Sequence, residues 1–404
     1  MLIKFCFFVF LFIYVINLKT TFFTFPIFYI FAPIGLLLVL KDFFTSYSVV
    51  ERKFCVFFGF IFLAIIANAL SFLINQSGDL LYYREVFFYS FISFFYAYFL
   101  NKIFLKIKDN SLDKLVLYFS AVVAVQLLIS FVLFLNKGLF DVFFSFFDSA
   151  IGYSGGEAID KFNEQRIIAI GNPFFGSAII NCFTLIILSI QFKYSNYKKI
   201  YMILWCLIVL FGIASARTTI LGVLISFLIL LKAYKVSFKY LLSIFVVGII
   251  VFNFLYFTNE RIQTIIDFSF NFLFDFRNSQ ASSSTGELIE MFKILPNKTG
   301  TWIFGDNLFK ADNGYYYKGI DVGYSRIIFA NGIIGLFVFL AMQIYMVFNI
   351  KFDKENIIDH IFLVSIILIL NFKGVANLTS LILVFFIYTV FSIKIKQKAK
   401  GEIL

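Results

Sequence analysis

The sequence predicts an all-α polytopic membrane protein with about 12 transmembrane helices and two long loops on its outer side. Three observations support this fold class: the composition, the recurrence of apolar runs of about 20 residues, and the distribution of lysine. Hydrophobic residues make up 61% of the 404 residues and charged residues 14%, against about 45–50% and 25% in soluble domains. We therefore interpret the net charge of +11 as a feature of membrane topology and expect no nucleic-acid partner.

The apolar runs divide the chain into twelve expected spans within one integral membrane domain, residues 1–404. The first span resembles a signal peptide, but it lacks a small-residue cleavage site and continues into the second, so we interpret it as a signal anchor. The spans cover residues 5–18, 22–40, 54–75, 86–100, 115–135, 167–192, 200–215, 218–231, 240–257, 327–349, 361–372 and 375–393.

The lysine distribution predicts that both termini lie at the cytoplasmic face. The even-numbered connections and the two termini hold 20 of the 34 basic residues and 8 of the 23 acidic ones. The inner face therefore sums to +12 and the outer face to −1, and short lysine-rich loops mark the cytoplasmic side.

Two outer connections, residues 136–166 and 258–325, are much longer than the others, and loops of this length are usually functional or disordered. In the first, Leu139, Val142, Phe143 and Phe146 recur at helical spacing, which predicts a helix lying flat at the membrane interface. The second ends in aromatic and acidic residues, which suit a sugar-binding surface. An aromatic belt at the headgroup level explains these aromatics equally well.

Arginine departs from the lysine pattern, because Arg52 is the only one of seven expected inside. A guanidinium is permanently charged and binds phosphate through two parallel hydrogen bonds, so the outer arginines predict an anion-binding role. The alternative is topological: lysine crowds inside and leaves arginine outside by chance. The six outer arginines are Arg84, Arg166, Arg217, Arg261, Arg277 and Arg326.

Arg217 interrupts an apolar stretch, residues 200–231, that is too long for one span. A single helix of that length would measure about 48 Å, against a bilayer core of about 30 Å. We therefore expect a hairpin with Arg217 at a sunken outer tip. A guanidinium there is costly unless it faces water or an anion, although it could also extend to the lipid phosphates.

Two further segments carry candidate residues. Arg166 begins the sixth span, where the sequence Gly171-Asn172-Pro173 interrupts the helix, and freed backbone groups are tolerated there only against protein or a cavity. The alternative is a kink that serves packing alone. Asp321 lies before the tenth span, where partial desolvation would raise its pKa and suit it to act as a general base, unless it is simply an exposed loop acid. Beyond it, Gly332 and Gly335 would let another helix approach closely.

Other chemistries are poorly supported, and we expect neither a metal nor a cofactor. The single histidine, His360, is expected inside, and all four cysteines fall within spans. Phosphate-loop, nucleophile-elbow and dinucleotide-binding motifs are absent from the sequence.

The order of these features resembles the O-antigen polymerase (Wzy) family, within the O-antigen polymerase/ligase superfamily. The resemblance covers roughly residues 136–345: long loops after the fifth and ninth spans, R-x4-GNP, a small-residue-Ser-x-Arg hairpin, and D-x-G-Y-x-R followed by G-I-I-G-L. It implies a metal-independent glycosyltransferase in the bacterial plasma membrane. Such enzymes join oligosaccharide repeat units, carried on undecaprenyl pyrophosphate, at the outer face.

The resemblance also assigns roles to individual residues. Arg166 and Arg217 match family arginines that hold the pyrophosphate, and Asp321 occupies roughly the place of an essential histidine in ligases. Our own hypothesis adds Arg326 or Arg261 as a further group that assists in binding the leaving pyrophosphate. The remaining expected substrate-binding residues are Glu287, a spare candidate base where many relatives have arginine, and Asn172 and Tyr324 within the motifs.

Two alternatives stay open. An O-antigen ligase shares the chemistry but uses a lipid A–core acceptor, and the lack of an expected outer histidine favours the polymerase. A lipid-linked oligosaccharide flippase predicts paired repeats and charges buried within spans, and the sequence lacks a convincing repeat. The expected partners are donor and acceptor undecaprenyl-pyrophosphate-linked oligosaccharides, the lipid bilayer and, optionally, a chain-length regulator protein.

Overall fold

The computed structural model is predominantly helical over the residues that it describes, which agrees with the expected all-α class. The described residues are 1–23, 25–45, 52–148, 166–233, 257, 260–275, 284–311, 315–352 and 356–399. Six helical segments in these ranges are long and apolar enough to cross a membrane, and four shorter helices are also apolar. The expected count of 12 spans stays a prediction, and the ninth, residues 240–257, lies outside the described residues except for Phe257.

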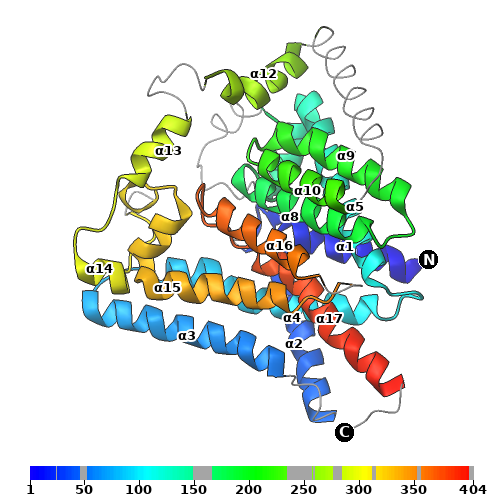
Figure 1. Cartoon of the computed structure of the whole chain (residues 1–404), viewed down its shortest axis with the longest axis horizontal. Coiled ribbons are helices and arrows are strands. Elements are labelled where there is room, and N and C mark those ends of the chain that lie inside the picture. Colours follow the sequence, from blue (N-terminus) through cyan, green and yellow to red (C-terminus); the bar gives the residue numbers. More distant parts are fainter. Residues whose placement is uncertain are drawn as a thin grey trace. The chain divides into compact units, whose positions relative to one another are not determined.

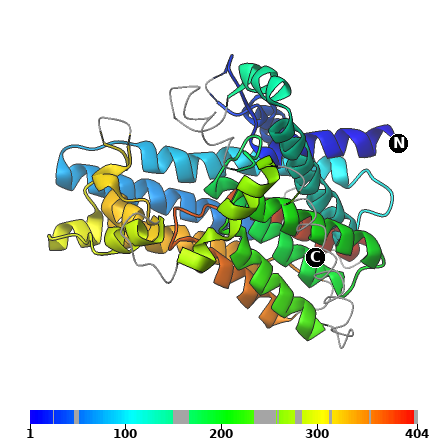
Figure 2. The same cartoon turned by 90° about the horizontal axis from the view of Figure 1, so that it is seen from above.

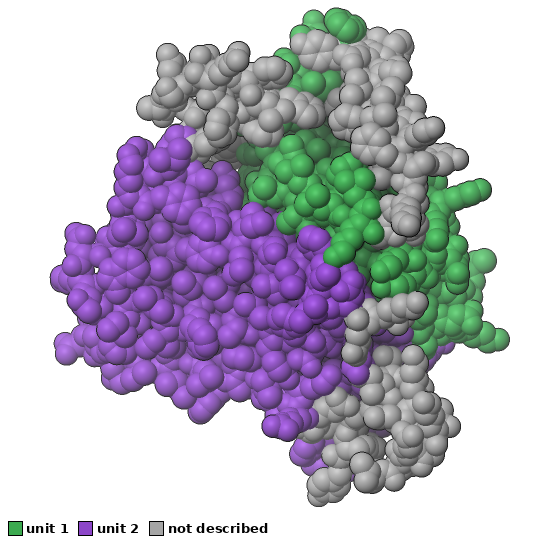
Figure 3. Space-filling view, in the orientation of Figure 1, with its two compact units in different colours: residues 1–28, 107–279 green, residues 29–106, 280–404 purple. Residues whose placement is uncertain are grey.

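The chain forms two compact units, coloured separately in Figure 3. Unit 1 comprises residues 1–28 and 107–279, and unit 2 comprises residues 29–106 and 280–404. Each unit is described by itself below, and the expectation of one integral domain stays a prediction.

Unit 1 is built around one helix, α8 (Phe175–Phe192), in which every residue from 177 to 192 is buried. A helix that is apolar on all sides belongs inside a bundle, and small polar residues on its surface bond the neighbouring helices. The other elements of unit 1 are α1 (Leu2–Ile16), β1 (Lys19–Thr20), α5 (Leu112–Leu135), α6 (Lys137–Phe146), β2 (Phe147–Asp148), α9 (Lys198–Ser215), α10 (Thr219–Ala233) and α12 (Glu260–Asp275).

The expected hairpin over residues 200–231 is confirmed, because α9 ends at Ser215 and α10 begins at Thr219. Its turn is joined to α8 by side chains. The hydroxyls of Ser177 and Ser215 lie 3.0 Å apart, and the Asn181 amide donates to the Thr219 hydroxyl at 3.3 Å.

The expected sixth helical span, residues 167–192, is wrong in its first third. Residues 166–174 form no helix, and α8 begins at Phe175. The Gly171-Asn172-Pro173 sequence therefore ends an irregular segment rather than kinking a helix, because its backbone bonds to other elements of unit 1, as described below.

The expected amphipathic helix is present as α6. Phe140 is buried and Phe143 packs beside it, whereas Leu139, Val142 and Phe146 stay exposed. The position of α6 at a membrane interface stays a prediction.

Unit 2 has its own central helix, α17 (Thr379–Ala399), which is buried throughout residues 379–391. Figure 1 shows α15 (Gly323–Phe348) alongside α3 (Arg52–Asn75), and in Figure 2 α3 lies beside α4 (Tyr89–Phe104), where aromatic rings of the two helices are in contact. The other elements of unit 2 are α2 (Phe28–Thr45), η2 (Tyr83–Phe88), α13 (Ser284–Phe292), α14 (Thr299–Phe304), η3 (Tyr317–Gly319) and α16 (Ile357–Leu370).

The close helix approach expected at Gly332 occurs, and the approaching helix is the short α14. Gly332 has φ +65°, and a Cβ added there would lie 2.1 Å from the Ile303 carbonyl oxygen. The helical path of α15 breaks at Asn331 and Gly332, so the backbone N–H of Asn307 reaches the Ala330 carbonyl at 3.1 Å. Glycine is required here for both its conformation and its lack of a side chain.

Candidate functional site

The irregular segment before α8 is held by polar groups of unit 1. The Ile170 N–H donates to the Ser130 hydroxyl at 3.0 Å, and the Gln126 amide donates to the Ile170 carbonyl at 2.7 Å. The Ile167 N–H donates to the Ala214 carbonyl at 3.3 Å. Buried backbone groups outside a helix thus find partners within the protein, as the sequence predicts.

Gly171 and Asn172 attach the same segment to the end of α1. Gly171 has φ +80°, and a Cβ there would lie 2.1 Å from the Ile16 carbonyl oxygen. The Asn172 amide donates to that carbonyl at 3.1 Å and its oxygen accepts from Asn17 at 3.4 Å. Both contacts of Asn172 position the segment, so they supply a structural role for a residue expected to bind substrate.

Arg166 and Arg217 lie beside the same hydrogen bond. Arg166 directly precedes Ile167, whose N–H is bonded to Ala214, and Arg217 follows Ala214 by three residues. Both arginines are half-buried. The Arg166 guanidinium carbon lies 3.7 Å from the ring centre of Phe174, an arrangement that orients its charge.

Arg261 joins the same region from α12. Its Nη1 donates to the Phe134 carbonyl at 3.1 Å, and Ile265, one turn later, packs in a buried cluster with Phe134. Ile167 and Ala214 belong to that cluster as well. Arg166, Arg217 and Arg261, called here the arginine cluster, therefore each lie within about one turn in sequence of a residue of this buried apolar cluster.

The partial burial of the three guanidinium groups affects the electric field around them. Guanidinium groups keep their charge at any physiological pH, and low-dielectric surroundings strengthen the field that they produce. The paired N–H donors of a guanidinium match the oxygens of a phosphate group.

Arg326 occupies a different environment in unit 2. Only 8% of its side chain is exposed, and its guanidinium carbon lies 3.5 Å from the ring centre of Tyr316 and 4.3 Å from that of Phe309. Its Nη1 is 4.0 Å from Oδ1 of Asp321. Two ring faces and one carboxylate thus compensate much of its desolvation.

Asp321 remains accessible, since 44% of its side chain is exposed. Burial of the remainder raises the pKa of its carboxyl above the ordinary value, while the positive charges of Arg326 and Lys373 oppose that shift. A raised pKa makes a carboxylate a better proton acceptor at neutral pH. Asp321 therefore has the accessibility and basicity that a general base needs.

The two remaining expected binding residues lie near Asp321. Tyr324 donates its hydroxyl to the Leu368 carbonyl at 2.7 Å, and its N–H bonds the Asn371 carbonyl at 3.2 Å. These contacts hold the start of α15 against the end of α16. Glu287 is exposed on α13, which packs against the residues around Asp321 through Leu288, Met291 and Phe292.

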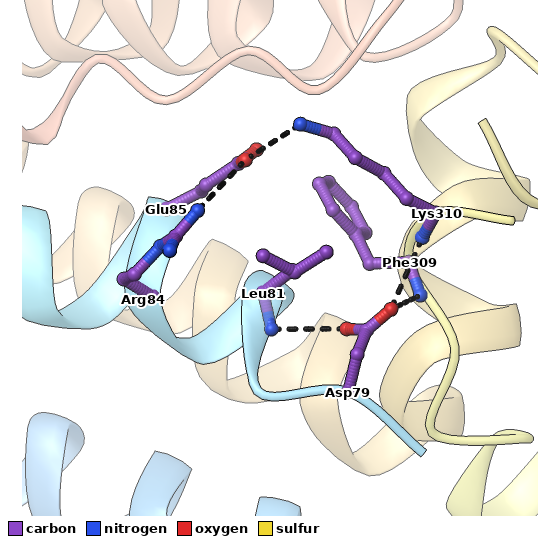
Figure 4. Close-up of polar contacts among 6 residues, drawn as sticks. All are labelled: Asp79, Leu81, Arg84, Glu85, Phe309 and Lys310. Atoms are coloured by element: carbon purple, nitrogen blue, oxygen red, sulfur yellow. Dashed lines mark hydrogen bonds and ion pairs between the residues drawn. The ribbon is translucent and has the colours of Figure 1, made fainter. Parts of the chain in front are cut away.

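Sequence reasoning missed an acidic anchor in unit 2, drawn in Figure 4. The Asp79 carboxylate accepts from the N–H groups of Leu81, Phe309 and Lys310 at 2.9, 3.0 and 3.2 Å. Glu85 then pairs with the Lys310 amine at 2.9 Å. These contacts hold Phe309 next to Arg326. The local sequence does not predict the contact between Asp79 and Phe309, because the two residues are 230 positions apart.

Sequence reasoning also missed Gln126 and Ser130, for which a signal exists. They are two polar residues one helical turn apart within an apolar span, and polar groups inside spans usually have buried partners.

The structure thus places Arg166, Arg217 and Arg261 next to the residues of one buried cluster in unit 1, and brings Asp321, Arg326, Tyr324 and the helix of Glu287 together in unit 2. Among the described residues, no group of three histidine, cysteine, aspartate or glutamate side chains could hold a metal ion. Comparison with protein-family models, curated proteins and solved structures found no match to this chain.

Proposed function

We propose that the protein is an O-antigen or surface-polysaccharide polymerase of the bacterial plasma membrane. In this proposal it joins undecaprenyl-pyrophosphate-linked oligosaccharide repeat units at the outer face. The observation that carries the proposal is the convergence of Arg166, Arg217 and Arg261 on one apolar core. A lipid-linked diphosphate combines the negative charge and the apolar tail that such a surface can bind.

The proposed reaction is a direct displacement at the anomeric carbon of the donor sugar. A hydroxyl oxygen of the acceptor sugar forms the new bond, the bond from the anomeric carbon to the pyrophosphate oxygen breaks, and Asp321 takes the hydroxyl proton. Negative charge grows on the departing diphosphate, so fixed guanidiniums stabilise the transition state more than the ground state. A single displacement inverts the configuration at the anomeric carbon.

The proposal uses one group of residues from each unit, and each group is described within its own unit. The arginine cluster provides permanent positive charge for the leaving group, and Asp321 provides an accessible carboxylate with a raised pKa. Arg326, which lies against the rings of Tyr316 and Phe309, is 4.0 Å from Asp321.

The test is the surface glycan of a strain that lacks the gene. A polymerase deletion leaves single repeat units on the lipid core, whereas loss of a ligase or a flippase leaves no surface glycan. Complementation with the unaltered protein should restore long chains, and Arg217→Ala should not, at equal amounts in the membrane. Lys298→Ala, an exposed lysine of unit 2, serves as the matched control. Long chains in the deletion strain would refute the proposal.

The Arg217→Lys variant tests whether two parallel hydrogen-bond donors are needed at this position. Lysine keeps the charge but loses the two parallel donors, so we expect only partial restoration of chain length. Full restoration would leave the diphosphate-binding role in place and remove the need for bidentate hydrogen bonding.

A further inference from the structure

Unit 1 carries an exposed apolar patch that the proposed reaction does not use. Its side chains are between 37% and 78% exposed and come from two segments that are distant in the chain. Apolar surface of this kind, left open to the surroundings, marks a contact with a membrane or with another protein. The apolar patch consists of Phe22, Phe23, Phe25, Leu139, Val142 and Phe146.

Helix α6 divides its ten residues among three faces, because each residue turns about 100° around the helix axis. One face packs on a buried cluster of unit 1, the next is apolar and exposed, and the third is polar and exposed. A helix that lies between protein, lipid and water needs these three faces. In the same order, the faces include Phe140, Phe143 and Phe144; Leu139, Val142 and Phe146; and Lys137, Asp141 and Ser145.

The phenylalanines of the first segment are joined to the end of α6. The Thr21 N–H donates to the Phe146 carbonyl at 3.0 Å, and the Thr21 hydroxyl donates to the same carbonyl at 3.3 Å. The ring centres of Phe23 and Phe25 lie 5.4 Å apart. The sequence assigns these phenylalanines to the second expected span, but α2 begins only at Phe28. They therefore extend the exposed apolar face of α6.

The apolar patch lies where two apolar helices of unit 1 end. Helix α5 is long and apolar enough to cross a membrane, and α6 follows it after one residue. The end of α1 lies beside the end of α5, because Ile16 and Leu133 belong to the same buried cluster as Phe140. Val132 and Leu135, in the last turn of α5, are exposed. Exposed apolar side chains of a membrane-crossing helix face lipid, so the patch continues a lipid-facing surface.

We propose that the apolar patch inserts into the outer leaflet of the lipid bilayer, independently of the polymerase proposal. The lysine distribution assigns this end of α5 to the outer face. A bilayer supplies both environments that the exposed faces of α6 need: acyl chains for the apolar face, and headgroups and water for the polar face. Interfacial helices bury their apolar face about 5–10 Å into the boundary between headgroups and acyl chains.

Quenching of tryptophan fluorescence by brominated lipids tests this proposal. The two native tryptophans are removed as Trp205→Phe and Trp302→Phe, and either Phe22→Trp or Val142→Trp is added. The whole protein is then reconstituted into phosphatidylcholine vesicles. Bromines near the headgroup should quench both tryptophans more than bromines near the chain end. The matched control is Ser145→Trp, on the polar face of α6, which should respond less to bromines and more to acrylamide in the water.

Leu128→Trp supplies a depth scale within the same unit. Leu128 is an exposed residue of α5, seven positions before Leu135, which places it about 10 Å deeper along the helix. Bromines near the chain end should therefore quench Leu128→Trp more strongly than Val142→Trp. Equal responses of these two variants to the deep bromines would contradict an interfacial position of α6.

Crosslinking of the unaltered protein keeps the proposal testable even if a tryptophan variant does not fold. A phosphatidylcholine with a photoreactive group near its headgroup should label Phe22, Phe23 and the exposed apolar face of α6, as mapped by mass spectrometry. Labelling of α5 without labelling of the patch would overturn the proposal. So would tryptophans at positions 22 and 142 that respond only to acrylamide, since the patch would then face water. Shielding from both quenchers would show that protein covers the patch, which overturns it as well.

Discussion

The segments that precede α8 and α15 differ in how their polar and charged groups are accommodated. Before α8, the backbone is irregular and buried, its polar groups are bonded by Gln126 and Ser130, and three arginines border the core beside it. Around the start of α15, positive side chains lie next to negative ones, and Arg326 is enclosed by aromatic rings.

Because of this difference, the two regions suit different chemical roles. A cluster of one charge sign is suited to a ligand that brings the opposite charge, which in our proposal is a diphosphate. In the region around the start of α15, called here the mixed region, Lys318 lies 3.8 Å from Asp306, Lys310 lies 2.9 Å from Glu85 and Arg326 lies 4.0 Å from Asp321. In our proposal, Asp321 of this region accepts the proton of an uncharged sugar hydroxyl.

The arginine cluster gives the largest predicted effect. Arg166→Ala and Arg217→Ala should each lower the rate of chain elongation at least about 100-fold, the usual cost of removing a charge-stabilising donor. If both act on one diphosphate, the double variant should be only slightly slower than either single variant. Elongation in membrane vesicles supplied with lipid-linked repeat units measures this. Fully multiplicative losses would show that the arginines act on separate groups.

The irregular segments give the second prediction, on stability. Gly171→Ala and Gly332→Ala should each lower the free energy of unfolding by at least about 1–3 kcal/mol, because both glycines have positive φ and no room for Cβ. Gly59→Ala is the control: no atom lies within 4 Å of its added Cβ, so it should stabilise α3 by about 0.5–1 kcal/mol. Denaturation midpoints in detergent compare the three variants. Unchanged stability of Gly171→Ala would argue against the described path before α8.

A third prediction concerns the pH dependence of the proposed base. Lys373→Gln removes a positive charge that lowers the pKa of Asp321, so that pKa should rise further. Because the base acts in its deprotonated form, the acid limb of the pH–activity profile should move to higher pH. The profile of kcat/KM against pH measures the shift, with Lys298→Gln as control. An unchanged acid limb would exclude Asp321 as the group that titrates.

The smallest effect is expected at the ion pair between Lys310 and Glu85. Their side chains are 32% and 36% exposed, and such pairs contribute about 0.2–1 kcal/mol. Lys310→Gln should therefore lower the unfolding free energy by less than about 1 kcal/mol and leave elongation unchanged. A tenfold loss of elongation would indicate that the mixed region contacts the substrate through Lys310.

Much of the fold could be predicted because helix formation in an apolar chain is local. The arms of the α9–α10 hairpin followed from the length of one apolar stretch and the position of Arg217. The amphipathic helix α6 followed from residue spacing, but the packing of Phe140 and Phe143 did not, because the spacing does not say which neighbours cover them.

Individual residues of the candidate site could be predicted from the sequence, but their contacts in space could not. Arg166 and Arg217 stood out as charges at the ends of apolar runs, and Asp321 as an acid before a span. The rings that enclose Arg326 come from a loop anchored by Asp79, a contact without any local sequence signal. Asn172, a predicted substrate-binding residue, bonds the end of α1, and its binding role stays a prediction.

The sequence by itself determined the class of the protein and the extents of most helices, since an apolar segment must satisfy its backbone hydrogen bonds within itself. Tertiary structure alone decided that residues 166–174 leave the helix, because their partners Ser130 and Gln126 lie 40 and 44 residues away from Ile170 in the chain. It also decided that residues next to three distant arginines share one buried cluster. The hydrogen bond between Ile167 and Ala214 depends on how the helices pack, and the local composition does not predict that packing.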